Sequence, residues 1–427
     1  MSVAGCSSSA LSSLSKTVAN PFAKKEVPLP GERIAVITDP TVNVDPAEAA
    51  KPIQLPPPQA NASWSEPGGS PGNNLGHLVL GDQLRKVWVV DAGTGSSSSG
   101  RLSAVPLVAE GKVFTLDAAG SVSAFSSASG GKLWRVSLTP ENEKSKEGFG
   151  GGLALDGGHL YAATGFGTVV GIDAGNGAIL WSKRIGEPIR SAPTAAGGKI
   201  YFVSAGNNLY ALNAADGEQL WTARGLPQSA TLLSNVSPAV SGNIVVATFP
   251  AGDVGAFDTS SGKGAWQESL ARSSETSASG ILGDPARPVI DRGVVFVVSH
   301  GGKMIAVSES SGERVWTRSL GSTQMPWVAG DTVFVVDLAG KLAALSRTDG
   351  KVRWLTELPA SARWSGPVLA GGKLWLVSGE GLVVGADART GQMVSQVDLD
   401  TAVFVAPVVA GGRMYILADN ASLIALN

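Results

Sequence analysis

A glycine followed four residues later by a tryptophan recurs along this chain, with 38 to 50 residues between successive tryptophans. The six complete pairs are Gly130/Trp134, Gly177/Trp181, Gly217/Trp221, Gly262/Trp266, Gly312/Trp316 and Gly350/Trp354. Gly391 begins a seventh copy in which Ser395 replaces the ring, and Trp88 is an eighth member that lacks the glycine. A period of about 40–50 residues indicates a repeat architecture, which overrides the two or three domains that length alone would suggest.

The unit at residues 191–221 shows what each repeat contains. Apolar, β-branched or aromatic segments alternate with turns that hold Gly, Asn or Asp, which predicts four short strands per unit. The segments are 191–194, 200–203, 209–213 and 220–222. A proline opens this unit, at Pro193, and six others, at Pro106, Pro238, Pro288, Pro326, Pro367 and Pro407. Four-stranded units that repeat radially are typical of a β-propeller.

The repeat count predicts the fold class. Eight fourth-strand positions, from Trp88 to Ser395, indicate an all-β, eight-bladed β-propeller of four-stranded antiparallel blades over residues 61–427. The last unit ends at its third strand, 422–427, so its fourth strand must come from 86–90. That pairing closes the ring and removes an open edge. We expect the tryptophans to pack neighbouring blades together, the alternative being a stacking surface for bases or sugars.

Composition narrows the function classes. The formal net charge is -2 and no Lys/Arg cluster occurs, which argues against nucleic acid as the main partner. No run of 18 apolar residues is present, which argues against a membrane-spanning helix. The single cysteine, Cys6, precedes the repeats, so the propeller itself has neither disulfides nor thiolate metal sites.

The N-terminal 60 residues differ from the rest. Residues 3–6, Val-Ala-Gly-Cys, resemble a bacterial lipobox, whose cysteine receives lipid after signal cleavage, although only five residues precede Cys6. We expect a truncated signal, and the alternative is an exposed thiol in a tail. Residues 7–60 are Ser- and Pro-rich, which predicts a flexible tether. Within it, 31–37 could form one strand.

The sequence offers no catalytic constellation. There is no HExxH, no GxSxG and no histidine pair at metal-ligand spacing. Residues 93–96 begin like a phosphate loop but lack its lysine, which favours a flexible loop. Three aspartates at the ends of third strands indicate a turn role: Asp173, Asp258 and Asp387. The histidines lie apart, at His77, His159 and His300.

Residues 211–221, Ala-Leu-Asn-Ala-Ala-Asp-Gly-Glu-Gln-Leu-Trp, resemble the repeat shared by pyrroloquinoline-quinone (PQQ) dehydrogenases and their non-enzymatic relatives. The enzymes of that family imply a calcium ion, acidic and amide ligands, a catalytic aspartate and often a disulfide over the cofactor. The propeller lacks cysteine and has little room for an active-site lid, so we predict no enzymatic activity, no cofactor and no metal. A PQQ- and calcium-dependent dehydrogenase remains the alternative.

Nearly the whole chain resembles the BamB family of outer-membrane β-barrel assembly lipoproteins, particularly its alphaproteobacterial form. The resemblance rests on Cys6, the Ser/Pro tether, eight PQQ-like repeats, and above all the stretches 324–331, 345–347 and 350–354. It implies a non-enzymatic scaffold at the periplasmic face of the outer membrane, lipid-anchored through Cys6. It also implies binding to the periplasmic domains of the central barrel-assembly subunit, and help in presenting nascent outer-membrane proteins.

In that family the contact uses inter-blade loops on one face of the ring, those that enter the blades near Pro238 and Pro288. Here these loops carry Ala230, Leu232, Leu233, Leu282, Asp284 and Arg287. The family's paired acidic residues are reduced to Asp284. Exposed leucines suit an interface, with a charge fixing register at its rim. The alternative for Leu232 and Leu233 is ordinary packing where a strand begins. A third possible function is a periplasmic propeller that binds a ligand in its central pore.

Overall fold

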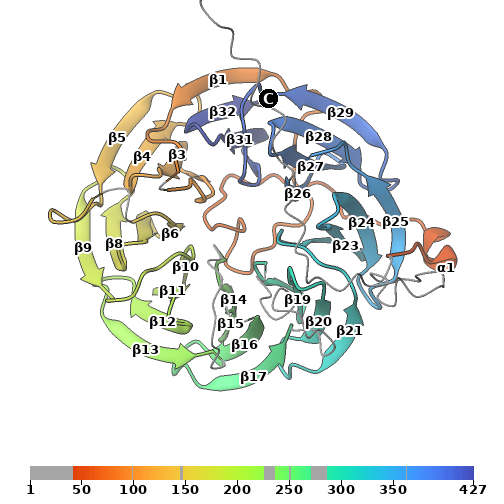
Figure 1. The fold of residues 1–427 in the computed structure, drawn as a ribbon, viewed down its shortest axis with the longest axis horizontal. Helices are drawn as coiled ribbons and strands as arrows, with labels where there is room; N and C mark the ends of the chain where they lie inside the picture. Colours follow the sequence, from red (N-terminus) through yellow and green to blue (C-terminus); the bar gives the residue numbers. More distant parts are fainter. Residues whose placement is uncertain are drawn as a thin grey trace, which may run out of the picture. The chain divides into compact units, whose positions relative to one another are not determined.

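The computed structural model describes residues 42–98, 100–144, 148–225, 236–249, 252–270, 286–361 and 363–427. Val42–Asn427 form one compact unit. Eight four-stranded antiparallel sheets stand around a common axis as blades (Figure 1). The predicted all-β, eight-bladed propeller is therefore confirmed. Within the described residues, no helix combines the length and the apolar character needed to cross a bilayer.

The blades follow the chain in order, each running from an inner strand to an outer one. Blade 1 consists of β2 (Leu107–Ala109), β3 (Lys112–Leu116), β4 (Ser121–Ser126) and β5 (Lys132–Ser137), and blade 2 of β6 (Gly151–Asp156), β7 (His159–Thr164), β8 (Thr168–Asp173) and β9 (Ile179–Arg184). Blade 3 consists of β10 (Thr194–Ala196), β11 (Lys199–Val203), β12 (Asn208–Asn213) and β13 (Gln219–Arg224), and blade 4 of β14 (Ala239–Ser241), β15 (Ile244–Thr248), β16 (Asp253–Asp258) and β17 (Gly264–Ser269). Blade 5 consists of β18 (Val289–Asp291), β19 (Val294–Val298), β20 (Met304–Ser308) and β21 (Arg314–Arg318), and blade 6 of β22 (Trp327–Ala329), β23 (Thr332–Val336), β24 (Lys341–Ser346) and β25 (Val352–Glu357). Blade 7 consists of β26 (Trp364–Ala370), β27 (Lys373–Ser378), β28 (Leu382–Asp387) and β29 (Met393–Asp398), and blade 8 of β30 (Val408–Ala410), β31 (Arg413–Leu417), β32 (Ser422–Leu426) and β1 (Lys86–Asp91).

Blade 8 joins the two ends of the propeller sequence. Strand β1 pairs antiparallel with β32, and Trp88 lies opposite Ala425 while Asp91 lies opposite Ser422. The predicted ring closure is confirmed. The outer strand of blade 8 thus comes from the beginning of the propeller sequence, and the other three strands come from its end.

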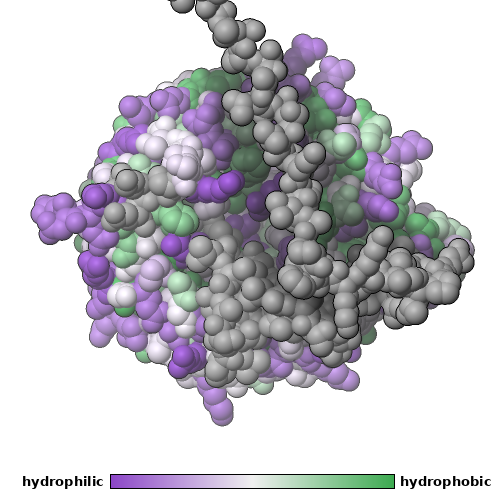
Figure 2. Space-filling model, viewed as in Figure 1, coloured by the Kyte–Doolittle hydropathy of each residue, from purple (hydrophilic) through white to green (hydrophobic). Residues whose placement is uncertain are grey.

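Burial explains why the middle strands are nearly continuous apolar runs. In β19, Val295 to Val298 are completely buried, since both faces of a middle strand lie against neighbouring blades. The outer strands instead alternate between exposed and partly buried residues, as in β5 and β17. Figure 2 shows the resulting hydrophilic rim at the left of the view.

The repeated tryptophans join each blade to the next. Trp181 of blade 2 donates from Nε1 to the carbonyl of Ala214 in blade 3, at 3.1 Å. Its Cε3 lies 2.6 Å from the position that a Cβ on Gly217 would occupy, and Gly217 has φ +74°. The same ring-on-glycine contact recurs at Trp88/Gly130, Trp134/Gly177, Trp221/Gly262, Trp266/Gly312, Trp316/Gly350 and Trp354/Gly391. The expected packing role is confirmed, and each glycine receives the ring of the preceding blade.

Ser395 breaks the pattern for a structural reason. A tryptophan at position 395 would pack on the turn between the third and fourth strands of blade 8. That turn does not exist, because those two strands come from opposite ends of the propeller sequence. Trp375 of β27 fills the neighbouring space instead: its Cζ3 lies 2.9 Å, and the Cβ of Ser395 3.1 Å, from a Cβ placed on Gly385.

Part of the segment predicted as a flexible tether lies against blade 6, at Asp45 and Glu48. Helix α1 (Pro46–Ala49) follows Asp45, whose amide donates to the carbonyl of Val352 in β25 at 2.9 Å. Arg353 is 7% exposed, and its guanidinium lies 3.5 Å from a carboxylate oxygen of Glu48 and 2.8 Å from one of Asp331. The ion pair of Glu48 with Arg353, both almost buried, therefore fastens α1 to the ring.

Candidate functional site

A central segment, residues 61–78, runs around the ring axis and contacts all eight blades (Figure 1). It bonds to the inner strand of each blade, or to the turn that follows this strand. The hydrogen bonds are Gly411 N to Asn61 O, Trp64 N to Val108 O, Leu155 N to Ser65 O, Ala195 N to the Glu66 carboxyl, Val240 N to Pro71 O, Ile290 N to Gly72 O, Trp327 Nε1 to Gly76 O, and Leu78 N to Leu369 O. The segment thus satisfies inner-edge groups that would otherwise lie unpaired.

Two buried polar side chains fix the central segment. Asn73 is completely buried, and its Nδ2 donates to the carbonyls of Pro238 at 3.3 Å and Pro288 at 2.9 Å. Glu66 is 1% exposed, and both of its carboxyl oxygens lie 3.3 Å from the amide of Ala195. Burial raises the pKa of Glu66 well above its ordinary value, because desolvation outweighs that hydrogen bond.

The stretches that most resemble the family serve this attachment. Trp327 stacks on Trp64, and Arg353 holds α1. Arg347 donates to a carboxylate oxygen of Asp291 at 3.0 Å, while Asn74 of the central segment donates to the other oxygen at 3.0 Å. The blade 6 residues that most resemble the family therefore bind the N-terminal part of the described chain.

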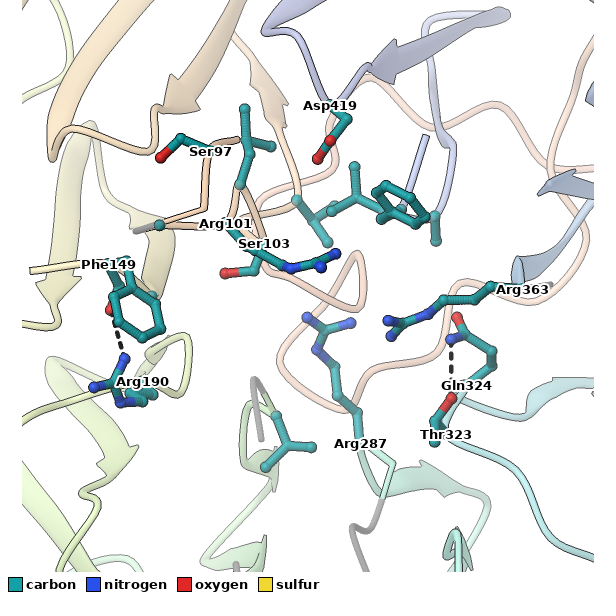
Figure 3. Close-up of a pocket in the computed structure, with 18 of the residues that line it drawn as sticks. Ser97, Arg101, Ser103, Phe149, Arg190, Arg287, Thr323, Gln324, Arg363 and Asp419 are labelled. Atoms are coloured by element: carbon teal, nitrogen blue, oxygen red, sulfur yellow. Dashed lines mark hydrogen bonds between the residues drawn. The ribbon is translucent and has the colours of Figure 1, made fainter. Parts of the chain in front are cut away.

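The opposite end of the axis holds a cavity. The central segment lies where the inner strands end, and a cavity of about 550 Å³ lies where they begin. The connections between blades line it, and four of them each contribute one arginine: Arg101, Arg190, Arg287 and Arg363. In Figure 3 the guanidinium groups of Arg101, Arg287 and Arg363 point toward one another into this cavity, while Arg190 lies beside Phe149.

The four arginines have different surroundings. Arg190 donates to the carbonyl of Phe149 at 3.1 Å and stacks on its ring at 3.9 Å, and burial lowers its pKa. Burial also lowers the pKa of Arg287, to about 10, so it stays protonated at neutral pH. Arg101 lies 5.9 Å from the centre of the Phe404 ring. Among the described lining residues, Asp419 is the one carboxylate, and it accepts a hydrogen bond from Ser96.

The loop at 93–96, predicted to be flexible, is held at several points, so that prediction was wrong. The amide of Thr94 donates to Asp117 at 2.9 Å, and Arg135 pairs with the same carboxylate oxygen at 2.6 Å. Ser96 bonds to Asp419. The glycine-rich sequence suggested mobility because the carboxylates that fix the loop lie in other parts of the chain.

The structure describes one of the predicted partner-binding residues. Arg287 is half-buried in the cavity wall, immediately before Pro288. The other five lie outside the described residues, as do Cys6 and residues 31–37; the five are Ala230, Leu232, Leu233, Leu282 and Asp284.

The remaining sequence candidates have structural roles. His77 joins two segments: its Nδ1 lies 2.7 Å from the carbonyl of Pro56, and its Nε2 accepts from the amide of Gly372 at 2.8 Å. The predicted turn role of Asp173, Asp258 and Asp387 is confirmed, since each side chain accepts from backbone amides two and three residues later. No group of three His, Cys, Asp or Glu side chains suited to a metal ion occurs in the part of the chain that the structure describes.

Sequence reasoning missed the arginine-lined cavity. Its arginines are separated by 76 to 97 residues, so no local motif contains two of them. A signal was nevertheless present, because each stands one to five residues before the proline that opens its blade: Pro106, Pro193, Pro288 and Pro367. Aligning the repeats on those prolines would have brought the four arginines together.

The family model described as "Outer membrane protein assembly factor BamB" matches residues 118–356 and 340–427. The protein of that name from Nitrosomonas eutropha is 26% identical over 221 residues, which cover 51% of this chain and 52% of that protein. The match thus spans about half of the Nitrosomonas protein. The protein of the same name from Yersinia pestis is 25% identical over 320 residues, 73% of this chain and 81% of that protein.

Solved structures with the same fold include a BamB protein and quinohemoprotein enzymes. The crystal structure of BamB from Moraxella catarrhalis superposes with a TM-score of 0.70 and 17% identity, covering 81% of this chain and all of that one. The quinohemoprotein alcohol dehydrogenase of Comamonas testosteroni also has a TM-score of 0.70, with 14% identity, covering 86% of this chain and 80% of that one. At these identities the structural matches establish the fold alone.

Proposed function

Since the chain belongs to the BamB family of outer membrane protein assembly factors, we propose that it is a non-enzymatic scaffold subunit of the machinery that assembles outer-membrane proteins. The observation that carries this proposal is the family match, which extends through residues 118–356 and 340–427. In this role the propeller binds the periplasmic domains of the central barrel-assembly subunit and helps to present nascent outer-membrane proteins.

The proposal includes a place in the cell. Residues 1–60 form the lipoprotein N-terminus and tether, and residues 61–427 form the propeller. Lipid on Cys6 holds the protein at the periplasmic face of the outer membrane. The attachment of α1 to blade 6 supports a tether whose last part is fixed to the ring.

The proposed contact surface is formed by the connections that enter blades 4 and 5, with Ala230, Leu232, Leu233, Leu282, Asp284 and Arg287. Asn73 supports this assignment indirectly, because it ties together the carbonyls of Pro238 and Pro288, where these two blades begin. Leucines in such a surface act as apolar contacts, and Arg287 sets the charge beside them.

Calorimetry with the isolated periplasmic domains of the barrel-assembly subunit tests the proposal. We expect saturable binding by the unmodified chain and loss of binding in the double variant Leu232→Asp/Leu233→Asp. The matched control is Leu133→Asp/Leu220→Asp, which adds the same charge at exposed leucines of β5 and β13. Unchanged affinity in a folded Leu232→Asp/Leu233→Asp protein would refute the contact surface. No binding by the unmodified chain would refute the scaffold.

The lipid anchor is tested separately. With a complete signal sequence supplied, Cys6→Ser should move the protein from the outer-membrane fraction to the soluble periplasmic fraction. Retention of the Ser variant in the membrane fraction would count against the anchor. The variant should still bind the periplasmic domains, since Cys6 is outside the proposed contact surface.

A quinoprotein dehydrogenase is the second candidate, and the observation behind it is the fold shared with a quinohemoprotein alcohol dehydrogenase together with a cavity on the ring axis. Titration with PQQ and calcium distinguishes the two candidates. The scaffold predicts no saturable binding and no alcohol oxidation with an artificial electron acceptor. Tight PQQ binding accompanied by oxidation would establish the enzyme.

A further inference from the structure

The axial cavity concentrates positive charge in a chain that carries little of either sign. Its described lining includes four arginines and one aspartate, a formal charge of +3 by subtraction, whereas the whole chain has a formal net charge of -2. A cleft lined by one sign of charge focuses the electrostatic field and raises the local concentration of ions of opposite sign.

Three of the guanidinium groups converge from separate blades. Arg101 precedes blade 1, Arg287 precedes blade 5 and Arg363 precedes blade 7, and Figure 3 shows their ends directed toward a common space. Like charges that face one another repel, and this cost persists in the absence of a counter-charge. Arg101 and Arg363 are both exposed to that space, and neither forms an ion pair with a carboxylate of the described residues.

Among the described lining residues, no carboxylate pairs with Arg101 or Arg363. The one described carboxylate, Asp419, receives the hydroxyl of Ser96. Arg190 is fixed on Phe149 by a hydrogen bond and by stacking, so it adds charge to the wall without reaching the centre. Gln324 is bound to Thr323 at 3.3 Å and accepts from the amide of Gly366 at 3.4 Å.

From this geometry we propose that the axial cavity binds a small multivalent oxyanion, with Arg101, Arg287 and Arg363 as its ligands and Arg190 as a fixed positive wall. Guanidinium groups match phosphate and carboxylate oxygens with paired hydrogen bonds, and several of them around one centre favour an anion with more than one charge. The volume of about 550 Å³ falls in the range of small-molecule sites. The site shares Arg287 with the proposed contact surface, but its test does not depend on the proposed function, because the anion is titrated into the chain without a protein partner.

Calorimetric titration of the full chain at fixed ionic strength tests the site, with inorganic pyrophosphate in one arm and citrate in the other. We expect one-to-one saturable binding in at least one arm. Binding of pyrophosphate alone identifies a phosphate site, and binding of citrate alone identifies a carboxylate site. Saturable binding in neither arm, or an isotherm that sodium chloride at matched ionic strength reproduces, overturns the proposal.

The residues are tested with Arg101→Gln/Arg363→Gln, which removes two charges at exposed positions and should weaken binding by about tenfold or more. The matched control is Arg224→Gln/Arg389→Gln, which removes two charges at exposed positions of blades 3 and 7, outside the cavity lining. We expect the control to bind like the unmodified chain. Equal weakening in both pairs would show attraction by net charge alone and would overturn the assignment. Circular dichroism checks that both pairs are folded.

Discussion

Trp64 stacks on Trp327, with ring centroids 6.0 Å apart and planes inclined by 26°. One ring belongs to the central segment and the other to β22, so a single pair couples the N-terminal part of the described chain to blade 6, 263 residues later. Both side chains are almost completely buried. The indole of Trp327 also donates to Gly76 of the central segment at 2.7 Å. The ring is therefore stabilised from its axis as well as by blade-to-blade contacts.

Replacing Trp64 by Ala should lower the free energy of unfolding by about 3–5 kcal/mol, the range for truncating a buried aromatic side chain. Equilibrium denaturation in urea measures the change. Leu133→Ala, at an exposed position of β5, is the control and should change stability by less than about 0.5 kcal/mol. If the two variants unfold at the same urea concentration, the axial segment does not stabilise the ring.

The ring-on-glycine contacts predict different costs for two glycines with similar backbones. Gly217 and Gly197 both have positive φ, +74° and +59°, so Ala costs about 1–2 kcal/mol at either from the backbone alone. A Cβ at Gly217 would also lie 2.6 Å from Trp181, whereas a Cβ at Gly197 would have nothing within 4 Å. Gly217→Ala should therefore be the more destabilising by about 1–3 kcal/mol. Equal melting temperatures would contradict the contact.

The buried carboxyl of Glu66 predicts a pH dependence of stability. Its pKa is raised in the folded chain, so folding takes up a proton above the ordinary value of 4.5. The stability that Glu66 contributes is thus fully present below about pH 4.5 and is lost as the pH rises toward the folded pKa. Glu66→Gln should remove this loss while keeping an oxygen for the amide of Ala195.

The comparison for Glu66 uses urea denaturation at pH 4.5 and at pH 7.5, at about the same ionic strength. Relative to Glu66→Gln, the unmodified chain should lose stability between these two values. Glu218→Gln, at an exposed position, should follow the unmodified chain. A constant difference between Glu66→Gln and the unmodified chain would mean that Glu66 has the same pKa in the folded and unfolded states.

Removing Arg353 should release α1 from blade 6. Arg353→Ala removes the buried guanidinium beside Glu48, which keeps its ion pair with Lys51, so the cost should be below the about 3–5 kcal/mol of an uncompensated buried charge. Hydrogen exchange should show loss of protection at the amide of Asp45, which bonds to Val352. Lys351→Ala removes an exposed ion pair to Asp45 and should cost at most about 1 kcal/mol. Retained protection in Arg353→Ala would show that α1 is held by other contacts.

Local patterns were sufficient for the fold. The Gly–Trp spacing, the opening prolines and the β-branched middle strands gave the number of blades, the four strands in each, and closure by 86–90. These features could be predicted because each follows from a local pattern that recurs in the repeats, and because a repeat buries its faces only against neighbouring repeats. The turn role of Asp173, Asp258 and Asp387 was predictable for the same reason.

The sequence by itself determined the ring, since the period of strands and turns is a local property repeated along the chain. Only the tertiary structure decided that Trp181 packs on Gly217 of the next blade, that Ser395 needs no ring, and that residues 61–78 touch every blade. It alone brought Arg101, Arg287 and Arg363 to one cavity. A closed ring places equivalent positions of distant repeats around one axis, so side chains separated by 76 residues or more in the sequence share a site that no local motif contains.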